Sequence, residues 1–370
     1  MKTDRISFAN GDSRINSPRY DGEFSARGSI LPEPFRYSLC MDPVRLTREL
    51  IDIESTTGNE AEVGDYLHGF LAKLGYRTEK MPVEGERHNV YATLDGTPDL
   101  VFSTHMDTVP PFIPSSEDTE RIYGRGSCDA KGIIAAQIAA AERLRRKTSK
   151  IGLLFLVGEE RDSQGAQEAN RHAPGSRFLI NGEPTENKIG RASKGTLRVQ
   201  LTAKGRMAHS AYPHLGESAI EKLVEALGRL LKMPLPENPE IGPTTFNIGS
   251  IEGGRAPNVI PDFARAQLLY RLVGPTQELR ENIQATVAGL ADAEFSLEIP
   301  YVKLRTVAGV PEMIAAFTTD IPALTNWGEP VLLGPGSIHV AHTDGEFLAK
   351  RDLSDAIDLY VSVAEKLLTS

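Results

Sequence analysis

The sequence predicts an α/β fold in which residues 41–193 and 302–370 form a main domain and residues 194–301 form an inserted α+β domain. Short apolar segments of strand type alternate with helical segments as far as residue 193. After that point the pattern changes to longer alternating strands and two amphipathic helices. The length of 370 residues agrees with two domains, because one hydrophobic core rarely serves so long a chain.

Composition restricts the class of partner. With 40% hydrophobic and 25% charged residues the chain is typical of soluble proteins, and its net charge of -9 argues against nucleic acid or an anionic membrane as the main partner. No apolar run reaches transmembrane length. The only cysteines are Cys40 and Cys128, which fits a reducing compartment better than a disulfide framework. We therefore expect a cytoplasmic protein.

Residues 1–40 differ from the rest of the chain. They are polar, contain scattered Gly, Ser, Arg and Pro, and show neither helical nor strand periodicity. They also lack the hydrophobic segment of a signal peptide. We expect a disordered extension, with Met41 as an alternative start.

Apolar spacing predicts the elements of the main domain in order. Helices are predicted at 44–53, 61–74 and 132–145, and strands at 90–94, 100–104, 151–157 and 178–180. The turn residues 95–98 between the first two strands suggest a hairpin. The run 151–157 is continuously apolar, as expected for a central strand covered on both faces.

The inserted domain and the end of the chain follow the same rules. Strands are predicted at 196–203, 244–251 and 264–272, with helices at 216–231 and 276–290. After the insertion we expect a helix at 311–319, a strand at 331–333 and a final helix at 353–368.

Acidic and histidine residues follow successive predicted strands of the main domain. His105, Glu159–Glu160 and Glu183 come after strand segments, and Asp129 precedes the buried helix. Open α/β sheets place their sites at the carboxyl ends of strands, so these residues should share one rim. Together with the late His342 they supply two imidazoles and several carboxylates, which is what a pair of zinc-like ions needs to activate water.

Taken alone, each residue also has a structural interpretation. A single His105 would more often be a satisfied structural group, and an isolated Asp129 would be an N-cap. Asp107, two residues after His105, can orient the imidazole if both face one cavity. The adjacent Glu159 and Glu160 cannot point the same way on an extended segment, so one can bind metal while the other faces the water. Their joint occurrence favours a metal centre.

Two histidines compete for the last ligand position. His339 lies in the Gly- and Pro-rich loop 334–341, and His342 stands immediately before a predicted helix. We favour His342 for its position directly before this helix.

These ordered motifs resemble the dinuclear zinc peptidases and deacylases that include acetylornithine deacetylase, succinyl-diaminopimelate desuccinylase, aminoacylase, carnosine dipeptidase and bacterial glutamate carboxypeptidase. The resemblance covers residues 42–370. It implies a zinc-peptidase-type α/β/α catalytic domain with an inserted α+β lid and dimerisation domain. It also implies two divalent metal ions per chain, zinc or alternatively cobalt.

The resemblance implies a role for each motif residue. One ion would be held by His105, Asp129 and Glu183, and the other by Asp129, Glu160 and His342. Glu159 would be the general base and Asp107 the carboxylate that orients His105. The peptide bond after Asp129 would be cis.

Further positions match substrate-binding residues of the resembling enzymes. His209 would enter the active site of a partner subunit and stabilise the oxyanion, which implies a homodimer. Asn258 and Arg271 would bind the substrate carbonyl and carboxylate, and the turn containing Gly336 would present N–H groups to a carboxylate. The relatives usually carry an Asp two residues before this Arg, whereas this chain has Leu269.

The predicted reaction is metal-assisted hydrolysis of an amide. A water shared by two ions gives its proton to Glu159, which later protonates the leaving amine. The Gly-Glu-Ser start of the helix at 216 and the short lid resemble the deacetylase and desuccinylase branch of these enzymes more closely, and this resemblance implies an N-acyl amino acid as the substrate. Alternatives are a dipeptidase or carboxypeptidase, an aminopeptidase, and a catalytically silent amino-acid-binding relative.

Overall fold

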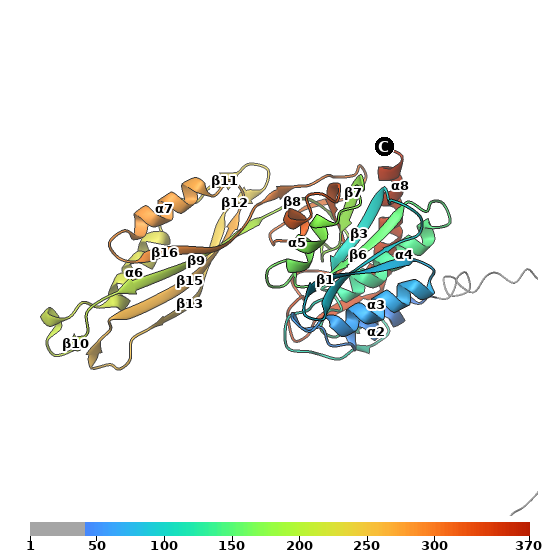
Figure 1. Cartoon of the computed structure of the whole chain (residues 1–370). Coiled ribbons are helices and arrows are strands. Elements are labelled where there is room, and N and C mark those ends of the chain that lie inside the picture. Colours follow the sequence, from blue (N-terminus) through green and yellow to red (C-terminus); the bar gives the residue numbers. More distant parts are fainter. Residues whose placement is uncertain (1–40) are drawn as a thin grey trace, which may run out of the picture.

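The computed structural model describes residues 41–370, which form two lobes. The inserted domain extends sideways from the main domain, and its strand β10 lies at the far end (Figure 1). The predicted disordered extension, residues 1–40 with Cys40, lies outside the described residues. Within the part that is described, no helix combines the length and hydropathy of a membrane span.

A nine-stranded sheet forms the centre of the main domain. Its order is β1-β2-β6-β3-β7-β19-β8-β17, and β18 pairs with β8 off this path. The strands are β1 (Arg77–Glu84), β2 (Arg87–Thr93), β3 (Leu100–His105), β6 (Ile151–Leu156), β7 (Phe178–Asn181), β8 (Ile189–Ser193), β17 (Val302–Lys303), β18 (Glu312–Ala315) and β19 (Glu329–Leu332). The neighbours β6, β3, β7 and β19 run parallel, so their carboxyl ends meet at one edge.

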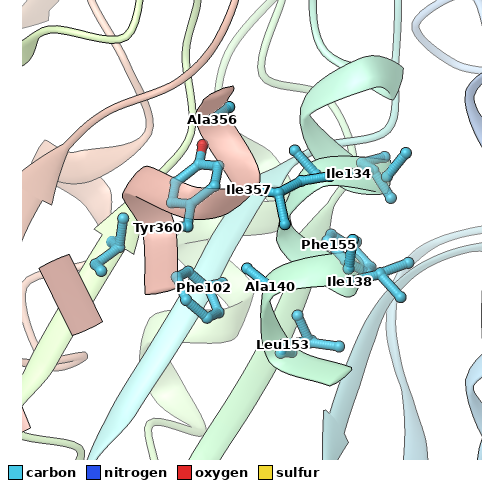
Figure 2. Close-up of a cluster of buried hydrophobic side chains, with 14 of the residues drawn as sticks. Phe102, Ile134, Ile138, Ala140, Leu153, Phe155, Ala356, Ile357 and Tyr360 are labelled. Atoms are coloured by element: carbon cyan, nitrogen blue, oxygen red, sulfur yellow. The ribbon is translucent and has the colours of Figure 1, made fainter. Parts of the chain in front are cut away.

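Helices cover both faces of this sheet. One face carries α2 (Pro43–Ile51), α3 (Ala61–Lys73), α4 (Lys131–Leu144) and α8 (Lys350–Leu368), and the other carries α5 (Gln164–Arg171) and the short 3₁₀ helix η2 (Ile321–Ala323). Phe102 packs with Ile134, Ile138 and Tyr360 on the first face (Figure 2), whereas its neighbour Val101 faces the second. This alternation explains why the central strands read as continuous apolar runs.

Two predictions for the main domain are wrong. Residues 311–319 contain strand β18 instead of a helix, because the short apolar segment pairs in parallel with β8, and periodicity cannot separate the two states over so few residues. The turn at 95–98 does not close a hairpin: β6 lies between β2 and β3. A turn sequence specifies a local reversal of the chain, but it does not determine which strands pair with each other. The other predicted elements are confirmed to within a few residues.

The inserted domain is an antiparallel sheet with helices on one face. The order is β13-β15-β9-β16, formed by β9 (Gly195–Lys204), β13 (Thr245–Gly253), β15 (Phe263–Leu272) and β16 (Asp292–Ile299). Helices α6 (Ala219–Leu230) and α7 (Gln277–Val287) pack against its apolar face. On β9 the buried Leu197 and Val199 belong to that face, so Thr196 and Arg198 belong to the opposite one.

The remaining elements are short. Strands β4 (Ser116–Glu117), β5 (Arg121–Tyr123) and β20 (Phe347–Ala349) form a small sheet in the main domain. The inserted domain adds the pairs β10 (Ala208–His209) with β14 (Val259–Ile260) and β11 (Glu237–Asn238) with β12 (Gly242–Pro243), and the 3₁₀ helix η1 (Pro213–Leu215).

Candidate metal centre

The predicted ligands gather at the carboxyl edge of the parallel strands. His105 is the last residue of β3, Glu159 and Glu160 follow β6, and Glu183 follows β7. Ligand atoms of His105, Asp129 and Glu160 all lie within 4.8 Å of one another, an arrangement that could hold a metal ion. Residues more than fifty positions apart in the sequence therefore meet because the strands run parallel.

His105 is fixed on both sides of its ring. Its Nε2 lies 3.0 Å from Oδ1 of Asp129. Its Nδ1 lies 3.0 Å from the backbone oxygen of Asp107 and 3.5 Å from the carboxylate of the same residue. Asp107 thus orients the ring chiefly through its backbone carbonyl, while its carboxylate accepts hydrogen bonds from the N–H groups of Glu159 and Glu160 at 3.1 and 3.2 Å.

His342 contacts the same carboxylates from the opposite end of the chain. Its Nε2 lies 2.8 Å from Oε1 of Glu160 and 3.3 Å from Oδ2 of Asp129. These two carboxylates raise the pKa of His342 to about 10. The neighbouring His339 is exposed and has no such contact. The prediction that His342 stands immediately before a helix is wrong: it lies in a turn with φ 63°, and the next helix, α8, begins at Lys350.

Asp129 lies in a loop that a second carboxylate holds in place. Oε1 of Glu346 accepts hydrogen bonds from the N–H groups of Gly126, Cys128 and Asp129 at 3.0, 3.1 and 3.1 Å. Its Oε2 lies 2.7 Å from Nη1 of Arg125, and both side chains are buried. The peptide bond between Asp129 and Ala130 is cis. Glu346 is not predicted as a site residue from the sequence, because the N–H groups that it binds lie more than 200 positions earlier in the chain.

The burial of several acids indicates that a cation belongs among them. Burial is the main cause that raises the pKa of Glu159 and of Glu183 well above the ordinary range, and nearby carboxylates add to it. Burial acts the same way on Asp129, but His105 and His342 outweigh it and lower the pKa of this residue. Oε1 of Glu183 is buried without a hydrogen-bond partner among the described residues. Such a donor set fits a pair of divalent cations.

A cavity of about 220 Å³ lies between these residues and the inserted domain. Asp129, Glu159, Glu160, Glu183 and His342 line the side that belongs to the main domain. The inserted domain contributes the open face of its sheet, including Thr196, Arg198, Leu269 and Arg271. Nη1 of Arg271 donates a hydrogen bond to Oγ1 of Thr196 at 2.9 Å, and this contact orients the guanidinium group.

The other predicted substrate residues lie outside this cavity. His209 is in β10 and Asn258 directly precedes β14, the strand that pairs with β10. The N–H of Ser210 donates to the carbonyl of Asn258 at 3.0 Å, so these two positions are neighbours at the far end of the inserted domain (Figure 1). Gly336 is buried with φ 79°, and its carbonyl accepts from the N–H of Glu186 at 2.7 Å.

Comparison with known proteins agrees with this architecture. Residues 191–296 match the model of a peptidase dimerisation domain. A peptidase M20 domain-containing protein of Schizosaccharomyces pombe is 36% identical over 335 residues, which covers 86% of this chain and 82% of the relative. A protein of Aspergillus flavus named probable carboxypeptidase is 38% identical over 371 residues, covering 87% and 86%.

Solved structures share the fold at lower identity. A tripeptidase from Staphylococcus aureus has a TM-score of 0.76 at 22% identity and covers 89% of this chain and 98% of its own. A dinuclear metal binding peptidase of the M20 family from Bacillus subtilis has a TM-score of 0.62 at 17% identity, covering 88% and 98%. The predicted fold class, an α/β/α catalytic domain with an inserted dimerisation domain, is confirmed. The chain belongs to the M20 family of metallopeptidases.

Proposed function

We propose that this protein hydrolyses the amide bond of an N-acyl amino acid. The observation that carries the proposal is the buried carboxylate of Glu159 beside the ligand-type residues, in a cavity that Arg271 covers from the inserted domain. A base, a metal site and a cation for a substrate carboxylate are the three parts that this reaction needs.

In this proposal His105, Asp129 and Glu183 hold one divalent ion, and Asp129, Glu160 and His342 hold the other. When bound, the two ions polarise the substrate carbonyl and acidify water, as zinc or cobalt would. Glu159 accepts the proton of the attacking water on its carboxylate and returns it to the nitrogen of the leaving amine. Its burial supports this role, because a raised pKa suits a group that must both take and give a proton.

Arg271 is proposed to bind the carboxylate of the released amino acid. Its hydrogen bond to Thr196 fixes the guanidinium without neutralising it, so the charge is free for a substrate anion. The turn at Gly336 is a further proposed contact for a carboxylate.

A second candidate shares this chemistry. A carboxypeptidase or dipeptidase also cleaves the amide next to an amino acid with a free carboxylate, and relatives at 37–38% identity carry the name probable carboxypeptidase. Both candidates place the free carboxylate near Arg271, and they differ in what the acyl side accepts. A cytoplasmic location stays a prediction from the cysteine usage.

We also propose a homodimer, supported by the match to a dimerisation domain. The inserted domain of this chain exposes large apolar side chains, which are typical of protein–protein contact surfaces. Among them are Ile251, Phe263, Val224 and Leu231. In the dimer His209 and Asn258 would contact the substrate bound by the partner subunit.

The test is release of amine by the zinc-loaded or cobalt-loaded protein from N-acetyl and N-succinyl amino acids and from dipeptides with free and blocked amines. Release that a chelator abolishes supports the proposal, and the preferred group of substrates selects between deacylase and peptidase. Cleavage only of substrates with a free amine would instead indicate a dipeptidase or an aminopeptidase. Absence of bound metal in the purified and metal-incubated protein would refute the site itself.

A further inference from the structure

The inserted domain lines the cavity with a further arginine, Arg198, that the proposed reaction does not use. Arg198 lies on β9, two residues from Thr196 and on the same open face of the sheet. The side chains between and beyond them, Leu197 and Val199, are buried against the helices of the inserted domain, which fixes the direction of Arg198 toward the cavity.

The register of the sheet places the two arginines diagonally. Arg271 on β15 pairs with Thr196, and Leu269 pairs with Arg198. Diagonal neighbours in an antiparallel pair are about 7 Å apart, so two guanidinium groups on such positions can bind two separate anions of one small molecule. Leu269 and Leu297 flank Arg198 on both sides and offer an apolar strip between the charges.

Arg198 has no counter-ion within the structure. No carboxylate of residues 41–370 lies within ion-pair distance of it or of Arg271. By contrast, Arg161 at the same cavity contacts Asp162 at 3.3 Å, and Arg265 on the same face of β15 contacts Glu252 at 2.9 Å. An unpaired cation facing a binding cavity is available to a ligand anion.

We infer that Arg198 determines specificity for a substrate with a second carboxylate, in addition to the one bound by Arg271. This inference rests on the proposed function, whose substrate class it narrows. The second carboxylate can belong to an acidic amino acid or to a dicarboxylic acyl group, since both present the same anion to Arg198.

The experiment measures equilibrium binding in the metal-loaded Glu159→Gln protein, where hydrolysis does not interfere. Calorimetry compares N-acetylglutamate with N-acetylglutamine, and N-succinylglycine with N-butyrylglycine. The members of each pair differ mainly by the second negative charge. The first pair tests an acidic amino acid as the source of the second carboxylate, and the second pair tests a dicarboxylic acyl group. The same titrations are repeated with Arg198→Gln added, and with Arg265→Gln added as a matched control from the same sheet face.

We expect at least one doubly charged ligand to bind about tenfold more tightly than its counterpart, the range of a charge-assisted hydrogen bond to a partly exposed group. Arg198→Gln should remove this preference and Arg265→Gln should preserve it. The inference would be overturned if both members of each pair bound with equal affinity, or if none of the four ligands bound. It would also be overturned if the preference survived Arg198→Gln, or if this substitution lowered the affinity for both members of a pair equally.

These outcomes are separate from a failure of the proposed function. Amide hydrolysis without any preference for a second charge would reject the role of Arg198 alone. Binding that depends on Arg198, together with no metal-dependent hydrolysis of any substrate in the amine-release panel, would reject the hydrolase and leave the anion site in place.

Discussion

Replacing Glu346 by Gln should destabilise the main domain more than its conservative size suggests. The glutamate is 1% exposed and accepts hydrogen bonds from three backbone N–H groups while its second oxygen contacts Arg125. A glutamine can still accept the backbone bonds through its amide oxygen. Its NH₂ group then faces the guanidinium of Arg125, and one buried charge is left without a partner.

The expected magnitude follows from this lost partner. Removing one member of a buried ion pair costs about 3–5 kcal/mol, a large part of a typical folding free energy of about 5–15 kcal/mol. Because the side chains of Arg125 and Glu346 are only 2% and 0% exposed, solvent screening reduces this cost little.

Urea unfolding of the chelator-treated protein measures this loss. Trp327 is the only tryptophan and is fully buried in the core of the main domain, so its fluorescence follows this domain and not the inserted one. The control is Glu365→Gln, which breaks a surface contact with Lys147 and should cost less than about 1 kcal/mol. A free energy of unfolding that falls by less than about 1 kcal/mol in Glu346→Gln would refute the reasoning.

Three further substitutions test other parts of the site. Glu159→Gln should retain both metals by elemental analysis but lower kcat by about 10²–10⁴-fold, the usual contribution of a general base; near-normal turnover would contradict that role. Asp107→Asn should weaken metal affinity or activity by about 10–100-fold, measured by titration of the metal-free protein, because an amide holds the Glu159–Glu160 loop and His105 less firmly. Gly336→Ala should lower the melting temperature, because φ is 79° and an added Cβ would lie 2.5 Å from Sγ of Cys128. The control Gly345→Ala should not lower it, because a Cβ at that position meets no atom within 4 Å. Equal effects of the two substitutions on the melting temperature would count against the steric argument.

The parts of the fold that sequence predicted well are those with a strong local signal. Strands β3 and β6 are buried on both faces, and the two strands end at His105 and shortly before Glu159. Four of the candidate ligands, His105, Asp129, Glu160 and Glu183, could be predicted because they stand in ordered motifs close to a strand end or a helix start, whereas His342 lies in a turn. Local pattern and global position agree there, as expected when a strand's end delivers a side chain to a site.

The parts that sequence missed depend on distant partners. Residues of β18 form a strand because they pair in parallel with β8. The turn at 95–98 does not determine which strand pairs with β2, and that partner is β6. Glu346 has no motif of its own, since its role is defined by N–H groups more than 200 positions earlier. The position of Arg198 diagonal to Arg271 depends on the register between β9 and β15, which no local sequence pattern specifies.

The length of the inserted sheet leads to a last prediction about the site as a whole. Arg271 lies near the cavity end of β15, and Phe263 at the other end pairs with Lys204, shortly before His209. Eight residues of strand span about 27 Å, so the inserted domain of one chain holds His209 far from its own cavity. His209 of a partner subunit would reach this cavity without any reversal in the direction of the inserted domain.

Mixing two inactive variants tests this arrangement. His209→Ala and Glu159→Gln each disable every site in their own dimers. After joint unfolding and refolding, a mixed dimer contains one site with an intact Glu159 and the partner's intact histidine, and one site with neither. Random pairing makes half of the dimers mixed, so activity should recover to about a quarter of the wild-type value if a two-fold dimer shares its sites. Refolded mixtures that stay as inactive as the separate variants, while refolded wild type regains activity, would show that His209 does not act across the subunits.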